Sequence, residues 1–201
     1  MNFNNVKTNL EAHGFAVSTF PTAKEAAAYL NEAIDGKTVG FGGSLTIDAM
    51  GLYESLGTHN EVYWHWRVGE GKTAADLRAI AANAEIYLSS VNGLAESGEI
   101  INIDGTGNRV AATLYGHEKV YLVVGKNKIA KDYDEALWRA RNVAAPKNAQ
   151  RLGMSTPCAA RGDRCYDCRA DARICRALTV LWEKPGGANV EVILIDEELG
   201  F

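Results

Sequence analysis

The sequence lacks an apolar run of the roughly 18–20 residues needed to span a bilayer, and it lacks any long basic stretch. Its net charge of −4 offers no global attraction to nucleic acid or to anionic membranes. The first 13 residues are polar and mixed, without the apolar core of a secretory signal. We therefore expect a cytoplasmic protein that binds neither nucleic acid nor membranes.

Cysteine is scarce, and its distribution is uneven. The chain has 4 cysteines, all between positions 158 and 175, with the spacing C-x6-C-x2-C-x6-C: Cys158, Cys165, Cys168 and Cys175. Because the cytoplasm keeps thiols reduced, the cluster predicts metal binding before free thiols or a pair of disulfides. Four thiolates suit either tetrahedral zinc or an iron–sulfur cluster, and the spacing leaves that choice open.

Arginines are concentrated around these cysteines, at Arg161, Arg164, Arg169, Arg173 and Arg176. Cationic neighbours lower the pKa of a thiol and offset the negative charge of a thiolate-ligated site. The same segment has few residues that could form a hydrophobic core. A bound metal would supply the folding energy that packing cannot supply there.

The rest of the chain has the composition of a globular protein, with 47% hydrophobic residues, and we expect a single domain over residues 1–201. Strand-like apolar segments alternate with helical ones, which predicts an α/β fold with a mostly parallel sheet and helices on both faces. Two further segments, 178–182 and 190–195, flank Pro185, Gly186 and Gly187. They predict a C-terminal antiparallel hairpin.

Three loops that directly follow predicted strands contain the candidate ligand-binding residues: Gly42, Gly43, Ser44, Asn92, Gly93, Gly125, Lys126 and Lys128. If the strands are parallel, the loops meet at one sheet edge, where ligands of α/β proteins bind. Glycines let a ligand approach the backbone, and the lysines suit an anionic ligand. The alternative for each loop is an ordinary turn with solvated side chains.

Candidate catalytic residues are few. Glu96 and Glu99 lie in the second loop, and either could act as a general base if it were partly buried. The four histidines are scattered without metal-pair spacing, and no Ser/His/Asp or Cys/His set can be assembled from sequence order.

Several segments taken together resemble one family: residues 39–46, 123–129, 145–151, the cysteine loop (residues 158–175), and the ending 199–201. The chain resembles the LUD domain family of lactate-utilization proteins, in its cysteine-containing branch. The resemblance implies a fold related to the ribose-phosphate isomerase and CoA-transferase superfamily (NagB/RpiA/CoA transferase-like). In that superfamily ligands lie over glycine-rich turns such as Gly42–Gly43–Ser44 and Asn92–Gly93.

The resemblance also implies an accessory role in the oxidation of L-lactate to pyruvate, beside iron–sulfur oxidoreductase subunits. It transfers no catalytic residue to this sequence. Two alternatives stay open: an isomerase or transferase acting on a phosphorylated, carboxylated or CoA-linked ligand, and a non-catalytic module with a structural zinc. A homo-oligomer in which a partner subunit covers apolar strand edges is compatible with all three.

Overall fold

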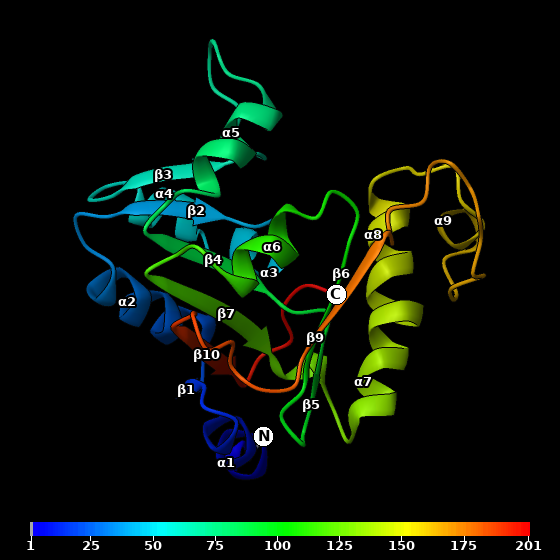
Figure 1. Cartoon of the computed structure of the whole chain (residues 1–201), viewed down its shortest axis with the longest axis horizontal. Coiled ribbons are helices and arrows are strands. Elements are labelled where there is room, and N and C mark those ends of the chain that lie inside the picture. Colours follow the sequence, from blue (N-terminus) through cyan, green and yellow to red (C-terminus); the bar gives the residue numbers. More distant parts are fainter. Residues whose placement is uncertain (1) are drawn as a thin grey trace.

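Two β-sheets organise the protein, whose computed structural model describes residues 2–201 (Figure 1). Sheet A has six parallel strands in the order β1-β10-β7-β4-β2-β3. They are β1 (Ala16–Phe20), β10 (Val190–Ile195), β7 (Lys119–Gly125), β4 (Ile86–Ser90), β2 (Thr38–Phe41) and β3 (Glu61–Trp64). Sheet B has the order β8-β5-β6-β9, comprising β8 (Ile129–Ala130), β5 (Gly93–Ala95), β6 (Ile100–Asp104) and β9 (Ala177–Leu181).

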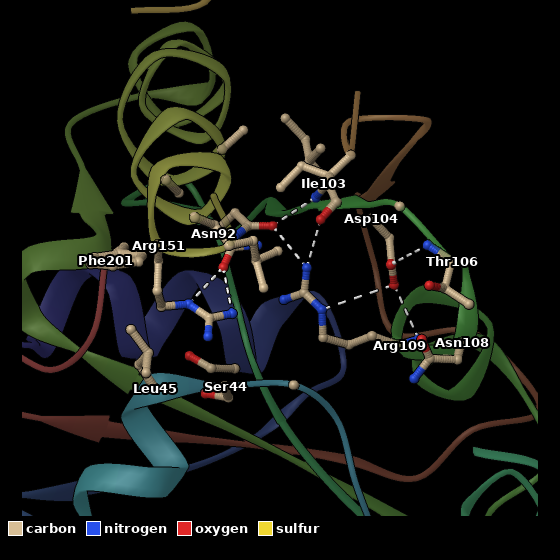
Figure 2. A pocket seen from close by; sticks show the side chains of 18 of the residues that line it. Ser44, Leu45, Asn92, Ile103, Asp104, Thr106, Asn108, Arg109, Arg151 and Phe201 are labelled. Carbon is tan, nitrogen blue, oxygen red and sulfur yellow. Dashed lines mark hydrogen bonds and ion pairs between the residues drawn. The ribbon is translucent and has the colours of Figure 1, made fainter. Parts of the chain in front are cut away.

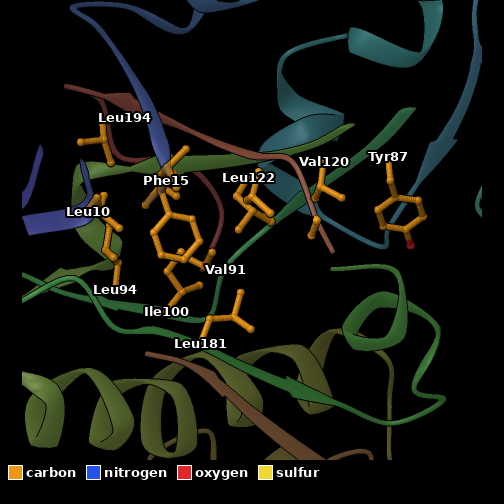
Figure 3. Packing of buried hydrophobic residues seen from close by; sticks show 14 of the residues in the cluster. Leu10, Phe15, Tyr87, Val91, Leu94, Ile100, Val120, Leu122, Leu181 and Leu194 are labelled. Atoms are coloured by element: carbon orange, nitrogen blue, oxygen red, sulfur yellow. The ribbon is translucent and has the colours of Figure 1, made fainter. Parts of the chain in front are cut away.

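Helices cover both faces of sheet A, as the sequence predicts. On one face lie α2 (Ala23–Ala33), α3 (Leu45–Ala49) and α4 (Leu52–Leu56), and their apolar residues pack on the strands. On the other face lie α1 (Asn4–Ala12), α5 (Ala74–Ala81) and α6 (Asn108–Leu114), together with sheet B. Figure 3 shows this second core, in which Leu10 and Phe15 meet Leu94, Ile100 and Leu181 of sheet B.

The central strands are buried along nearly their whole length, which explains their uninterrupted apolar sequences. Every residue of β4 and β10 is buried, and so is all of β7 except Lys119. A strand covered on both faces has no polar side to alternate with its apolar one. Among residues 2–201, no helix has the length and apolar character required to cross a membrane.

The predicted C-terminal hairpin is wrong. β9 pairs antiparallel with β6 in sheet B, whereas β10 lies between β1 and β7 in sheet A and is parallel to both. The turn at Pro185, Gly186 and Gly187 therefore carries the chain from one sheet to the other. Proximity in sequence and a turn signal suggested pairing, but β10 is wholly buried and completes the parallel sheet instead.

One long helix covers the outer face of sheet B. It runs through α7 (Tyr133–Arg139), a π-helical turn η2 (Ala140–Ala144) and α8 (Ala145–Arg151). Pro146 has no backbone N–H and its ring crowds the preceding turn, so the helix widens at η2 to accommodate it. Beyond α8 come α9 (Pro157–Arg161) and the cysteine loop, on the side of α8 away from sheet A (Figure 1).

Gly93 permits close packing of sheet B on this helix. A Cβ atom there would lie 2.5 Å from the backbone oxygen of Ala136 in α7. We therefore expect Gly93→Ala to lower the free energy of unfolding by about 2–3 kcal/mol, as overpacking does. Gly186→Ala, whose Cβ would meet nothing within 4 Å, is the matched control in urea unfolding. Equal stability of the two variants would contradict this packing role.

Candidate functional site

The three loops singled out in the sequence meet at one edge of sheet A, as predicted. β7, β4 and β2 are parallel neighbours, so the segments that follow them leave the sheet on the same side. η1 (Lys126–Lys128) follows β7. A cavity of about 340 Å³ lies at this edge, and Gly43, Ser44, Asn92 and Lys128 line it. This is where ligands bind in open parallel sheets.

The cavity is rich in positive charge, and we call it the cation cavity. Four cationic side chains line it: Arg78, Arg109, Lys128 and Arg151. Asp104 is the one Asp or Glu among its lining residues within the described part of the chain. Figure 2 shows Arg109 and Arg151 entering the cavity from opposite sides, with Ser44 and Leu45 below Arg151 in this view. Such a lining attracts anions.

Lys128 is the most buried of the four cations, with 4% of its surface exposed. Its Nζ donates hydrogen bonds of 2.8 Å to the hydroxyls of Thr46 and Ser90, which themselves donate to backbone oxygens. No carboxylate of residues 2–201 pairs with it. Burial, with the nearby positive charges of Arg139 and Arg109, lowers the pKa of Lys128 to about 7. The amine therefore changes charge near neutral pH.

Arg109 is fixed by a frame of backbone and amide oxygens. It donates to Asn102 Oδ1 and Asn92 Oδ1 at 3.1 Å and to the Ile103 backbone oxygen at 2.6 Å. Its Nε lies 3.9 Å from Asp104 Oδ2, and burial lowers its pKa. The carboxylate of Asp104 also accepts backbone N–H groups from 106, 107, 109 and 110. Asp104 thus orders the turn into α6 and partly offsets one cation.

Arg151 and Arg78 are held more loosely. Arg151 Nε and Nη2 donate to Asn148 Oδ1, and the guanidinium stacks 4.9 Å from the Trp66 ring. Arg78 Nε and His65 Nδ1 are buried without a hydrogen-bond partner among the described residues. Burial and the charge of Arg78 lower the pKa of His65 to about 4, so His65 is neutral at neutral pH. These groups leave donors available to a ligand.

Four of the predicted ligand-binding residues lie outside the cavity lining: Gly42, Gly93, Gly125 and Lys126. A Cβ at Gly42 would lie 3.0 Å from Arg109 Cγ, so this glycine makes room for the arginine. A Cβ at Gly125 would lie 2.8 Å from backbone atoms of Glu197 and Leu199, and Gly93 packs on α7. Lys126 forms an ion pair with Asp196 at 3.1 Å. Of the two lysines, Lys128 faces the ligand space.

The candidate bases Glu96 and Glu99 are not at the cation cavity. Glu96 lies in a shallow surface depression with Asn5, Asn9 and Lys131, and its backbone oxygen accepts from Asn9 Nδ2 at 2.7 Å. Glu99 accepts a hydrogen bond from the neighbouring Ser97. The structure does not bring either carboxylate together with Ser44, Asn92 and Lys128.

Sequence reasoning missed Arg78, Arg109 and Arg151, which supply most of the charge. Arg109 follows a glycine-containing turn, and its glycines indicate a loop but do not indicate a ligand-binding site. Arg151 ends a segment that was noticed for its family resemblance alone, and Arg78 lies inside an ordinary helix pattern. A ring of cations contributed by unrelated elements leaves no local pattern in the sequence.

The four cysteines surround a second, much smaller cavity of about 20 Å³, which we call the cysteine cavity. All four are unpaired and half-buried. Arg141, Arg173 and Ile174 also line the cavity. No residue from 160 to 176 is buried, which agrees with the low apolar content of this segment. The cysteine loop therefore has no hydrophobic core of its own.

N–H donors approach two of the four sulfur atoms, those of Cys165 and Cys175. The Asp167 backbone N–H donates to Cys165 Sγ at 3.3 Å, within a tight turn where Asp167 has φ of 47°. Arg173 donates to Cys175 Sγ at 3.4 Å, and Arg141 approaches Cys165 Sγ at 3.9 Å. As the loop stands, no three His, Cys, Asp or Glu side chains of residues 2–201 converge on one metal position. Four cysteines that line one cavity, with cationic donors beside them, fit the chemistry of thiolate ligands.

The fold and the site define the class: an α/β protein of two packed sheets with a cation-lined cavity at the carboxyl edge of its parallel strands. The sequence matches the LUD domain family over residues 3–195, and the chain belongs to that family. No curated protein sequence matches it.

One solved structure shows the same fold. A DUF162 family protein from Deinococcus radiodurans is 16% identical and superposes with a TM-score of 0.54, covering 97% of this chain and 99% of the other. The eIF2B delta protein from Chaetomium thermophilum is 17% identical, with a TM-score of 0.37 over 67% of this chain and 54% of the other. The second likeness is too low to support an argument. Kinship with the ribose-phosphate isomerase and CoA-transferase superfamily stays a prediction.

Proposed function

We propose that this LUD-domain protein binds a small anionic metabolite in the cation cavity and a metal centre in the cysteine loop. In that form it would serve as an accessory to the iron–sulfur-dependent oxidation of L-lactate to pyruvate, beside oxidoreductase subunits. Membership of the LUD domain family supports the pathway. The geometry of the cavity supports the anionic ligand.

The observation that carries the proposal is the imbalance of charge in the lining of one cavity. Four cations and one carboxylate line about 340 Å³. Lys128 is held by hydroxyls and not by an acid, so its charge is not compensated within the fold. Burying unpaired charge is costly, and an anionic ligand would remove that cost.

The polar groups at the cavity would contribute to the binding of such a ligand in different ways. Arg151 and Arg78 offer guanidinium donors that match a carboxylate or phosphate bidentately. Lys128 supplies an amine that is protonated most fully when an anion sits beside it. Asn92 and Asn102 hold the Arg109 guanidinium in position. These contacts bind and orient a ligand, and they assign no proton-transfer step.

The size and charge of the cavity also favour a second candidate. Lactate and pyruvate each carry one negative charge, whereas the cavity offers four cations. A phosphorylated or CoA-linked ligand, or a molecule with several carboxylates, would use more of them. An isomerase or transferase acting on such a ligand is therefore the alternative function, with Lys128 as the buried amine at its site.

The cysteine loop completes the proposal. A single zinc ion needs four sulfurs about 2.3 Å away from it, whereas an iron–sulfur cluster is larger and holds its cysteines farther apart. The sulfurs of Cys158, Cys165, Cys168 and Cys175 line a common cavity. Four thiolates suit either centre, and analysis of metal and acid-labile sulfide decides between them. Bound there, a cluster would supply one-electron redox chemistry.

Replacing Arg151 with glutamine tests the anion site with little risk to the fold. Arg151 is exposed, and its hydrogen bonds go to Asn148 alone. Isothermal titration with L-lactate, pyruvate, citrate, phosphate and sulfate should show binding by the natural protein. The affinity of the best ligand should fall about tenfold in Arg151→Gln, as loss of one charged hydrogen-bonding partner predicts.

Lys24→Gln is the matched control, because it removes one positive charge from the exposed surface of α2. It should bind like the natural protein. A preference for pyruvate or lactate supports the accessory role, and a preference for citrate or phosphate supports the alternative. Absence of binding to every anion would overturn both.

A further inference from the structure

The two cavities share a wall. Ala145 and Ile174 line the cation cavity and the cysteine cavity alike. Ile174 is the residue directly before Cys175, so its backbone position depends on where that cysteine lies. Any rearrangement of the cysteines around a metal would therefore act on a residue that the anion also contacts.

A first connection runs through sheet B. Immediately after Cys175, the Arg176 backbone N–H donates to the Asp104 backbone oxygen at 2.9 Å, and Ala177 pairs with Asp104 in the sheet. The next residue, Gly105, touches Ile174 so closely that a Cβ there would lie 2.7 Å from the Ile174 oxygen. Asp104 in turn lies against Arg109. The end of the cysteine loop thus abuts the frame that positions one of the cations.

A second connection runs through the π-helical turn. Within η2, Asn142 Oδ1 accepts the Cys165 backbone N–H at 3.2 Å, and Arg141 donates to Asp167 at 3.1 Å. The residues that follow on the same helix, Ala145 and Arg151, line the cation cavity. A π-turn is a site where a helix can change its local winding. Here the π-helical turn η2 lies between the cysteine loop and the cation cavity.

We infer that the metal-loaded cysteine loop sets the shape of the cation cavity, so that metal binding and anion binding strengthen each other. Ile174 is the positioning residue of this coupling. The inference rests on the proposed function, because it needs both sites to be occupied. Coupling of this kind is reciprocal: the anion holds the metal more tightly by the same factor.

The test compares sulfate binding, whose charge does not vary near neutral pH, in two forms of the full chain. One is purified without oxygen and loaded with iron and sulfide, and the other is stripped by a chelator and oxidant. We expect sulfate to bind the loaded form about tenfold more tightly, at the lower end of typical coupling between sites. Sulfate should also slow the release of iron to a chelator. Far-UV circular dichroism verifies that the stripped form keeps its sheets.

Ile174→Ala removes most of one side chain from the wall that the two cavities share. This variant distinguishes a loss of coupling from a loss of binding. We expect both ligands still to bind, with the tenfold difference reduced to about twofold. Leu178→Ala is the matched control, because Leu178 lies on β9 close to the same loop but lines neither cavity. It should keep the full difference.

Equal sulfate affinity in the loaded and stripped forms would overturn the coupling and leave the anion site standing. Failure of both forms to bind sulfate or any other anion of the panel would overturn the proposed function instead. A protein that takes up no iron under reconstitution would overturn the coupling and the cluster together.

Discussion

Lys128→Met should weaken sulfate binding about 100-fold, the largest effect that we expect from any single cavity residue. The variant removes a buried amine that can donate a charged hydrogen bond, and each such bond is worth roughly 1.5–3 kcal/mol. It leaves the hydroxyls of Thr46 and Ser90 bonded to their backbone acceptors. Titration calorimetry measures the loss.

The same substitution should stabilise the ligand-free protein. The folded pKa of Lys128 is about 7, below the value of about 10.4 in an unfolded chain. Between these pKa values the unfolded state binds more protons, so the stability of the natural protein rises with pH there. Methionine avoids this penalty, which these pKa values put at about 4 kcal/mol near neutral pH. It also loses the two hydrogen bonds of the amine, so we expect a net gain of about 1–3 kcal/mol. Urea unfolding at several pH values would show the gain shrinking as pH rises.

Sulfate affinity should change with pH in the opposite direction from the folding stability of the natural protein. Below about pH 7 Lys128 is protonated and attracts the anion, so sulfate affinity should fall as pH rises through that value. In Lys128→Met this dependence should disappear. Lys126→Met is the matched control, because it removes a lysine from the same turn that does not line the cavity. A loss in Lys126→Met as large as that in Lys128→Met would contradict the assignment.

Paired replacement of Cys165 and Cys168 by serine should remove the metal centre completely. These two cysteines form the tight turn of the C-x2-C pair, where the Asp167 N–H donates to Cys165 Sγ. Because no residue from 160 to 176 is buried, we expect the loop to depend on a bound metal for its order. Iron and acid-labile sulfide should fall to background, and proteases should cut within the loop while sheets A and B stay intact.

Tyr166→Phe is the control for this pair. Tyr166 lies in the same turn, but its hydroxyl bonds Asp163 and Arg161 rather than a sulfur. This variant should keep its metal and its resistance to proteolysis. If the natural protein bound one zinc and no sulfide, the cluster would be excluded and the loop would be a structural zinc site.

The sequence predicted the parallel sheet and its ligand edge because both depend on local patterns. Buried strands show apolar runs, and the loops after β2, β4 and β7 carry glycines and polar residues that the parallel topology brings together. Ser44 and Lys128 were found in this way.

The features that the sequence did not predict depend on contacts between residues that are distant in sequence. β10 is drawn into sheet A by burial on both faces, which a turn beside β9 could not reveal. Arg78, Arg109 and Arg151 come from three separate helices and gather only when the fold is complete. Gly93 looked like part of a ligand loop, whereas its contact with Ala136 belongs to packing.

The central claim, that the cation cavity binds an anion, is tested most directly by titrating pyruvate, citrate and sulfate into the natural protein and into Arg151→Gln/Lys128→Met. We predict saturable binding of at least one anion by the natural protein and none by the double variant. Equal binding by the two proteins, or no binding by either, would contradict the account.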